Sequence, residues 1–374
     1  MIRPFGTWLD RRRALAELKR ALQAERNVTA LDDANPLNRA KIALQVDDRA
    51  AARHYFDLAK ARIPAFLRTT PDTIEVMLGL EAYDEAEDFI AEGMRLFPRE
   101  AYLAEGFALV AERRADLETA ITRWAMVRKR FPSRPLAYVQ GAGCLRRLGR
   151  FAEADAVIRR AMALMPDDVA VRLEYGRIGE ASGDWTDAYR RWAEISDRHP
   201  AGLTGMAEAL HRQGKDAEAE ALLEKSRMIW PLEAGMRALY ARIAAEAGRI
   251  DEAAERWAVV RDRFPRDQIG YTEGLTLLRA HLRWEEADAV ATEAVRQFPD
   301  RTWPHLEYAM LAHARRDWPA AAVRWAAVRE ALPDEPIGYQ RGIEALEASG
   351  DTDAANRLRA AYNDKFLAKA STDL

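Results

Sequence analysis

The sequence predicts an all-helical fold of stacked helical hairpins, because an alanine and a proline recur at a nearly fixed spacing along the 374-residue chain. The alanine returns every 34 residues, with a single step of 31 residues. The ten alanines are Ala52, Ala86, Ala120, Ala154, Ala188, Ala219, Ala253, Ala287, Ala321 and Ala355. A period of this length is typical of a solenoid in which each hairpin buries its apolar face against its neighbours.

The second recurring residue is a proline that follows each of the first nine alanines by twelve residues. These prolines are Pro64, Pro98, Pro132, Pro166, Pro200, Pro231, Pro265, Pro299 and Pro333. Proline cannot continue a helix, and it pushes the residue before it toward extended backbone angles. Each proline therefore marks the end of a unit, and the alanine marks the place where the two helices of a hairpin cross most closely.

The segment 135–166 shows how one unit is built. Its pattern predicts a first helix over about 137–148 and a second over about 152–164, with apolar residues at helical spacing. Gly149 separates the two helices, because glycine reaches left-handed backbone angles at little cost. The same break recurs at Gly183, Gly214, Gly248 and Gly350.

A longer rhythm overlies the first, because the bulky residue four positions after the repeat alanine is tryptophan only in alternate units. The four tryptophans are Trp124, Trp192, Trp257 and Trp325. The units between them carry Ile158, Leu223 or Ala291 there. The true building block is therefore a pair of 34-residue repeats, about 68 residues long. Rings at helical spacing are expected in the core, not around a cofactor.

This pattern resembles the tetratricopeptide repeat, a 34-residue helix–turn–helix with a small residue at position 8, alanine at 20 and proline at 32. The resemblance covers residues 33–367 in ten units, of which Leu367 ends the last in place of proline. Position 8 departs from the pattern at Ile74, Leu275 and Ile343. The resemblance implies a right-handed superhelical solenoid. The Trp-x-x-Val-Arg flavour of its units looks like repeats of alphaproteobacterial proteins.

Two short segments flank the repeats. Residues 1–32 predict a basic amphipathic helix that caps the end of the stack, although such a helix could also lie on a membrane surface. Residues 368–374 form a C-terminal tail. The single 31-residue step, before Pro231, predicts a shortened first helix and a flexing point at 195–215, because Gly202 and Gly205 are poor helix residues.

Composition sets the class of protein. The chain is 49% hydrophobic with a net charge of −3, which gives no general attraction to nucleic acid or to a membrane. Cys144 is the only cysteine, so no internal disulfide can form. The arginine-rich N-terminus has no apolar signal-peptide core, and no run of 18 apolar residues exists. The predicted compartment is the cytoplasm.

No motif supports catalysis. The six histidines form no His-Glu-x-x-His pair, and nucleotide loops and nucleophile elbows are absent, so we predict no enzyme, no metal and no cofactor. Cys144 could act as a nucleophile beside a histidine and an acid, but a lone cysteine in an apolar helix is more typical of inert packing.

The resemblance also implies a binding surface, since repeat positions 2, 5, 9, 12 and 13 usually line a concave groove. Carried onto this sequence, the partner-binding set is Arg146, Arg147, Arg177, His211, Arg212, Arg242, Arg279, Trp303 and Met310. The groove is expected to be cationic in its middle, where few acids stand against the arginines, and more apolar near Trp303. The set suits an acidic or phosphate-bearing segment, or it is simply a solvated charged face.

The predicted function is therefore a scaffold that binds a protein or an acidic peptide, with a link to surface-glycan biosynthesis suggested by the alphaproteobacterial flavour. The lysine that clamps chaperone C-termini at position 5 is absent, since Glu105, Val139 and Leu173 stand there. One alternative is an RNA-associated half-a-TPR protein. Trp303 and Tyr308 favour it, but the net charge of the chain is wrong for strong phosphate binding. Another is an enzyme with an unrecognised site.

Overall fold

The structure, a computed structural model, describes residues 36–45, 47–62, 71–299 and 301–367. Within these ranges every regular element is helical, with twenty α-helices, one π-helical turn and no strand. The chain divides into two compact units between Leu222 and Leu223. The segments 1–32 and 368–374 fall outside the described residues, so the predicted cap and tail stay predictions.

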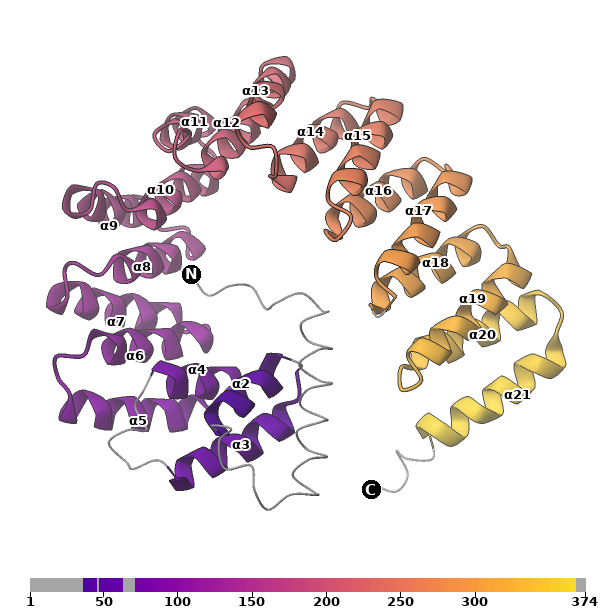
Figure 1. Ribbon diagram of the computed structural model, residues 1–374, viewed down its shortest axis with the longest axis horizontal. Coiled ribbons are helices and arrows are strands. Elements are labelled where there is room, and N and C mark those ends of the chain that lie inside the picture. The colour runs from indigo at the N-terminus through magenta and orange to yellow at the C-terminus, as the bar shows by residue number, and fades with distance from the viewer. Residues whose placement is uncertain (1–35, 46, 63–70, 300, 368–374) are drawn as a thin grey trace. The chain divides into compact units, whose positions relative to one another are not determined.

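In each unit, consecutive helices form antiparallel hairpins that stack in chain order (Figure 1). The first unit contains α2 (Pro36–Gln45), α3 (Arg49–Arg62), α4 (Pro71–Gly79), α5 (Tyr83–Leu96), α6 (Ala101–Arg113), α7 (Leu117–Arg130), α8 (Pro135–Arg147), α9 (Phe151–Leu164), α10 (Val169–Ser182), α11 (Trp185–Ala193) and α12 (Pro200–Arg212). The unit boundary lies within α13 (Asp216–Ile229). The second unit continues with α14 (Ala234–Glu246), α15 (Ile250–Arg263), α16 (Ile269–Ala280), α17 (Trp284–Gln297), α18 (Thr302–Ala314), α19 (Trp318–Ala331), α20 (Pro336–Ala348), α21 (Thr352–Tyr362) and the π-turn η2 (Asn363–Leu367).

The repeat alanines lie where the sequence places them. All ten are fully buried, at 0% exposure. In the unit 135–166 the observed helices α8 and α9 differ from the predicted ranges by at most two residues at each end. The alternate tryptophans are also core residues, since Trp124 and Trp325 are completely buried and Trp192 and Trp257 are 4% and 3% exposed. The hairpin architecture and the core assignment are thus confirmed.

Enlarging a repeat alanine tests the close helix crossing. Ala154→Leu and Ala253→Leu are each expected to lower the free energy of unfolding by at least ~1 kcal/mol, because added methylenes overpack a filled core. Ala152→Leu, at an exposed alanine of the same helix α9, is the matched control and should leave the melting temperature unchanged. Wild-type melting temperatures in both core variants would contradict the assigned crossing.

The turns inside the hairpins use two kinds of residue. All five predicted glycines have a positive φ, from 72° at Gly149 to 87° at Gly350. Five other turns place a non-glycine residue there: Asp47, Glu81, Ala115, Leu282 and Arg316. Left-handed angles cost such residues about 1–2 kcal/mol each. The turn geometry is therefore more uniform than the glycine pattern predicted.

The 31-residue step has a different structure from the one predicted. The first helix α12 keeps 13 residues, and the preceding second helix α11 is the short one, with 9 residues against 14 in α9. The expected shortening of the first helix is therefore wrong. Gly202 and Gly205 let α12 approach the end of α11, because a Cβ at Gly202 would lie 2.6 Å from the Cα of Ser196. The flexing point stays a prediction.

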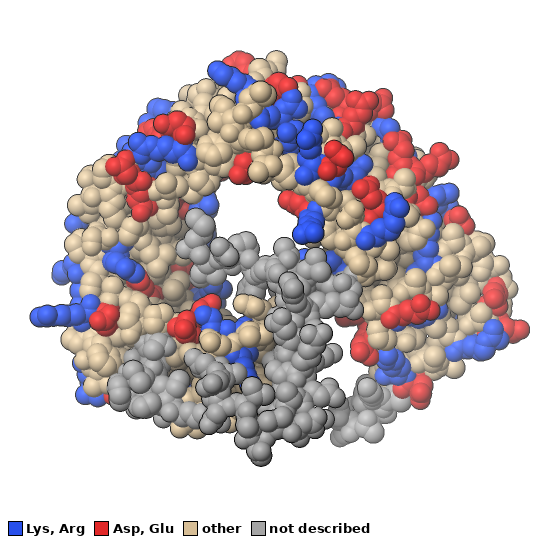
Figure 2. Space-filling model, viewed as in Figure 1, with Lys and Arg blue, Asp and Glu red and all other residues tan. Residues whose placement is uncertain are grey.

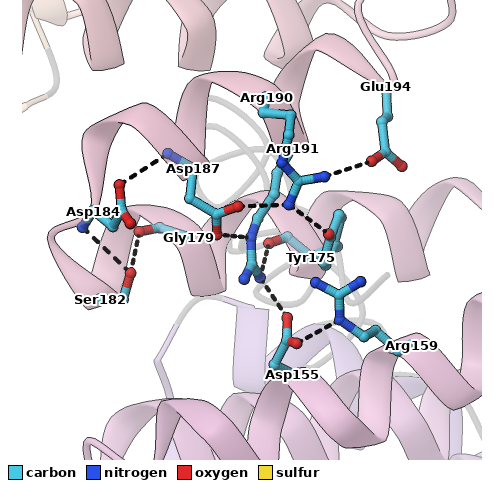
Figure 3. A network of polar contacts seen from close by, with 10 residues as sticks. All are labelled: Asp155, Arg159, Tyr175, Gly179, Ser182, Asp184, Asp187, Arg190, Arg191 and Glu194. Carbon is cyan, nitrogen blue, oxygen red and sulfur yellow. Dashed lines mark hydrogen bonds and ion pairs between the residues drawn. The ribbon is translucent and has the colours of Figure 1, made fainter.

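The tryptophan-bearing repeats are linked to the repeat before them by a buried arginine. Arg191 of α11 lies over the ring of Tyr175 of α10, 4.3 Å from its centroid, and donates a hydrogen bond to the Tyr175 carbonyl oxygen (Figure 3). Its guanidinium also reaches Asp155 of α9 at 2.7 Å and pairs with Asp187. Arg191 is 8% exposed, so this network belongs to the core of the first unit.

The same contact recurs in every tryptophan-bearing repeat. An arginine at position 23 stacks on an aromatic ring at position 7 and donates to its carbonyl oxygen. The other three pairs are Arg123 with Phe107, Arg256 with Tyr240 and Arg324 with Tyr308, at 3.6, 3.4 and 3.7 Å from the ring centroids. Arg123 and Arg324 also pair with an acid of the preceding repeat, Glu87 and Asp288.

A second arginine, at position 28, reaches forward to the next repeat. Arg128 donates to the carbonyl oxygen of Ala137 at 3.0 Å and lies 5.9 Å from the ring centroid of Tyr138. Arg261 and Arg329 donate in the same way to Gly270 and Gly338. Arg123, Arg191 and Arg324 thus reach back to the preceding repeat, and Arg128, Arg261 and Arg329 reach forward to the next one. Ser196 stands at position 28 of the Trp192 repeat, which lacks the forward contact. The contacts that are present follow the 68-residue rhythm.

Candidate functional site

The candidate site is the first-helix face, which we define as the side chains at positions 2, 9, 12 and 13 of the first helices. Its nine predicted residues divide between the two units. Arg146 and Arg147 of α8, Arg177 of α10, and His211 and Arg212 of α12 belong to the first unit. Arg242 of α14, Arg279 of α16, and Trp303 and Met310 of α18 belong to the second.

The structure brings Arg146 and Arg177 together around one buried acid. Glu174 of α10 is 2% exposed. The Nε of Arg146 donates to it at 2.8 Å, and a guanidinium nitrogen of Arg177 lies 3.5 Å from its second oxygen. A carboxylate at this depth is costly without cationic partners. Arg146 and Arg177 therefore stabilise Glu174, in addition to any role toward a partner.

Two further acids lie on this face of the first unit, each beneath an indole. Glu112 accepts a hydrogen bond from the Nε1 of Trp124 at 3.3 Å and lies 3.5 Å from Arg147. Glu180 accepts one from the Nε1 of Trp192 at 2.8 Å. Burial raises the pKa of both carboxyl groups. The core tryptophans thus position two acids of the candidate site.

The remaining residues of the first unit lie at the end of α12. The His211 side chain is 9% exposed, and its Nδ1 lies 2.7 Å from Asp216. This contact joins the end of α12 to the start of α13, so His211 stabilises the turn of the hairpin. Arg212 is 46% exposed and pairs with Glu208 one turn earlier at 2.8 Å.

In the second unit the predicted residues lie on three helices. Arg242 is 44% exposed, 3.6 Å from Glu246, and Arg279 pairs with Glu307 of α18 at 2.8 Å. Met310 is exposed. Trp303 instead packs into the core, its ring centroid 5.6 Å from that of Phe298.

Sequence reasoning missed the acids that accompany these arginines. Glu174 and Glu307 occupy position 6 of their repeats, which lies outside the family's groove positions. A signal was present, because Arg146 and Glu174, and likewise Arg279 and Glu307, are separated by the same 28 residues. Position 12 of one first helix therefore faces position 6 of the next.

Charges of both signs are interspersed over the viewed surface of the described residues (Figure 2). Together with the ion pairs above, this overturns the expectation that few acids oppose the arginines. Exposed pairs of this kind contribute only about 0–1 kcal/mol each. An exposed pair such as Arg242 with Glu246 can thus exchange its carboxylate for one from a partner at little cost to stability, whereas Arg146 and Arg177 are held by the buried Glu174.

Cys144 of α8 lies beneath this face and is completely buried. Burial, reinforced by the negative charge of Glu112, raises the pKa of its thiol to about 12. A thiol with so high a pKa holds very little of the nucleophilic thiolate near neutral pH. Its surroundings are those of a packing residue.

Thiol labelling tests this assignment. At pH 8 the folded chain is expected to react with iodoacetamide at least about a hundredfold more slowly than the urea-unfolded chain, because the thiol is buried and protonated. The reaction is followed by mass spectrometry. Rapid labelling of Cys144 in the folded chain would reopen a nucleophilic role.

Other kinds of site find little support. The described residues contain no cluster of three or more His, Cys, Asp or Glu side chains that could hold a metal ion. A shallow depression of about 370 Å³ on the first unit is lined by Phe107, Thr119, Arg123 and Met126 among others, and Arg123 there is held by Phe107 and Glu87. No described helix is long and apolar enough to cross a membrane.

The stacked hairpins define the class as a helical-repeat protein. No protein-family model matches the chain, and no curated protein does. Among solved structures, yeast Tom70 matches with a TM-score of 0.51 and 14% identity, over 96% of this chain and 90% of that one. A tetratricopeptide repeat protein from Parabacteroides merdae matches with a TM-score of 0.44 and 16% identity, over 65% of this chain and 96% of that one. The Cut9–Hcn1 complex of the APC/C matches with a TM-score of 0.39 and 9% identity, over 83% of this chain and 63% of that one. The fold is therefore that of a tetratricopeptide-type helical solenoid.

Proposed function

We propose that the chain is a non-catalytic scaffold that binds acidic segments of a protein partner on the first-helix face of each of its two units. The observation that carries the proposal is a set of half-exposed arginines, Arg147, Arg212 and Arg242, at 44–46% side-chain exposure. Of their carboxylate partners, Glu246 is 44% exposed, whereas Glu112 and Glu208 are 18% and 17% exposed. A guanidinium can bind a carboxylate through two parallel hydrogen bonds, which favours an acidic partner over a neutral one.

Binding proceeds by exchange in this proposal. A partner carboxylate replaces Glu208 at Arg212 or Glu246 at Arg242. At Arg147 it binds beside Glu112, which stays hydrogen-bonded to Trp124. Because an exposed pair is worth about 0–1 kcal/mol, the exchange costs little, and further contacts of the partner decide the affinity. Met310 offers an apolar contact in the second unit. Binding is expected to weaken as salt rises, since ions screen exposed charges over about 8–10 Å.

The test is a triple variant, R147Q/R212Q/R242Q. Immobilised full-length chain is incubated with lysate of cells that express it, and retained proteins are quantified by mass spectrometry. We expect the variant to lose most of the acidic proteins that wild type retains, with a melting temperature within a few degrees of wild type, because the removed pairs are exposed. A matched control, R95Q/R198Q/R359Q, removes the same charge from exposed ion pairs outside the first helices.

Equal retention by the two triple variants would contradict the proposal, and retention that nuclease abolishes would favour RNA. Arg146 and Arg177 are left out of the test variant deliberately. Their removal would leave Glu174 buried without a cation, so loss of binding and loss of stability would coincide.

Compartment and pathway belong to the same proposal. We assign the chain to the cytoplasm, because its one cysteine is buried as a free thiol, which suits a reducing compartment. The link to surface-glycan biosynthesis and the bacterial origin rest on the Trp-x-x-Val-Arg resemblance alone. Identified partners in the experiment above decide that link.

A further inference from the structure

The end of α13 and the turn after it expose apolar side chains to an unusual degree. Met228 is 86% exposed, Leu232 85% and Ile229 57%. In the described part of the chain, no other large apolar side chain is as exposed as the first two. All three lie in the second unit, away from positions 2, 9, 12 and 13. An exposed apolar patch of this kind marks an interaction site more often than chance.

The packing of the repeats does not account for these residues. Met228 occupies position 29 and Leu232 position 33, and most other units place a charged residue at one or both. The counterparts include Arg95, Lys129, Asp262 and Glu330 at position 29, and Arg99, Asp167, Arg266 and Asp334 at position 33. Hairpin stacking is therefore satisfied by polar residues at these positions, and the apolar ones are peculiar to this turn.

Beside the apolar residues lies a cluster of three arginines. Elsewhere an arginine at position 28 lies over a tyrosine at position 4 of the next repeat, as Arg329 does over Tyr339. Here position 4 of the following repeat is Arg237, and Arg227 at position 28 lies over Tyr240 at position 7, 5.8 Å from its ring centroid. Burial, then the charges of Arg227 and Arg263, lower the pKa of Arg237. The three guanidinium groups are thus close enough to repel one another.

This cluster lacks enough negative charge. Arg227 pairs with Glu224, and Arg263 lies only within 4.0 Å of its neighbour Asp262. Arg237 has no carboxylate partner among the described residues. The indole N–H of Trp230, in the same turn, is buried and has no acceptor in the described part of the chain. A carboxylate from outside would relieve the repulsion around Arg237.

We propose that Met228, Leu232 and Arg237, flanked by Arg227 and Arg263, form a second docking site that takes a short protein segment with carboxylates beside large apolar side chains. The carboxylate binds Arg237 through its two oxygens, and the apolar side chains cover Met228 and Leu232. An anionic lipid surface suits the site less well, because Arg227 and Arg263 already have Glu224 and Asp262 as partners, and a membrane gains only about 1 kcal/mol for each basic residue near its surface. This site is separate from the first-helix face and does not depend on it.

Short random peptides displayed on phage are the probe. The full-length chain is used for selection, and bound peptides are compared with those retained by the variant M228S/L232S/R237Q. We expect the enriched peptides to combine Asp or Glu with Leu, Ile or Phe, and to bind the variant at least about tenfold more weakly. A charge-reversed variant, R237E, should shift the enriched peptides from acidic to basic residues.

A matched control, V323S/R296Q, changes another highly exposed apolar residue and an arginine of the same unit, and should bind the selected peptides as wild type does. Far-UV circular dichroism verifies that all variants fold. Peptides that bind the first variant as tightly as wild type would overturn the proposal. It would also be overturned if wild type, but not that variant, sediments with phosphatidylserine vesicles and no peptide is enriched. The R147Q/R212Q/R242Q variant should still bind the peptides, which separates this test from that of the first-helix face.

Discussion

Replacing Arg191 with methionine is expected to lower the free energy of unfolding of the first unit by about 3 kcal/mol or more. Methionine keeps much of the volume but removes the cation that Asp155 and Asp187 share, so that Asp155 keeps only Arg159 and Asp187 only Arg190 (Figure 3). It also removes the Arg191 hydrogen bond to the Tyr175 carbonyl oxygen. Removing one partner from a buried charged network costs far more than the net worth of the pair, because the other charges stay buried.

The measurement is urea unfolding, together with hydrogen exchange of α10 and α11, because repeat arrays can unfold unit by unit. Arg190→Gln is the control at the adjacent position, where the side chain is 54% exposed, and it should change stability by less than about 1 kcal/mol. If both variants unfold at the same urea concentration, the network in Figure 3 does not hold the three helices together.

Adding one methyl group at Gly176 or Gly205 is expected to destabilise the first unit by about 1–3 kcal/mol. The two glycines come from α10 and α12 and lie against the indole of Trp192. A Cβ at Gly176 would stand 2.6 Å from the ring carbons, and one at Gly205 would stand 2.5 Å from them. Alanine favours a helix by about 0.8–1.0 kcal/mol over glycine, so the contact with a rigid ring has to outweigh that gain.

The identical substitution at Gly235 provides a control of opposite sign. Gly235 lies in the first turn of α14, and nothing would lie within 4 Å of its Cβ. Gly235→Ala should therefore stabilise the chain by up to about 1 kcal/mol. Thermal melts of the three variants give the comparison. Stabilisation by all three substitutions would show that α12 is not packed directly on Trp192.

The sequence predicted what the period determines. Ala154 and its nine counterparts are buried, the tryptophans are in the core, and Gly149 has a left-handed backbone. The sequence prediction assigned the 31-residue step to the wrong helix, because a deletion in a repeat can shorten the helix on either side of the turn. In the structure α11 is the short helix, α12 keeps its full length, and Gly205 of α12 packs closely on Trp192 of α11.

The candidate site was less predictable, because its charges depend on pairing between repeats. Family positions identified Arg146 and Arg279, but they could not show that Glu174 and Glu307 face them from the next first helix. Arg237 was missed altogether. It stands at a position that usually packs between hairpins, and its isolation becomes visible only when the arginines around it are placed in space.

The alternating arginine contacts determine how this chain can gain or lose length. Arg123 needs an acid in the repeat before it, and Arg128 needs the carbonyl oxygen and the tyrosine ring of the repeat after it. Excising one 34-residue repeat would join two repeats of the same kind and leave such a contact without its complement, whereas excising a pair would leave matching surfaces at the seam. The unit by which this protein can gain or lose length is therefore the double repeat. Natural or engineered relatives should differ in length by whole pairs of repeats.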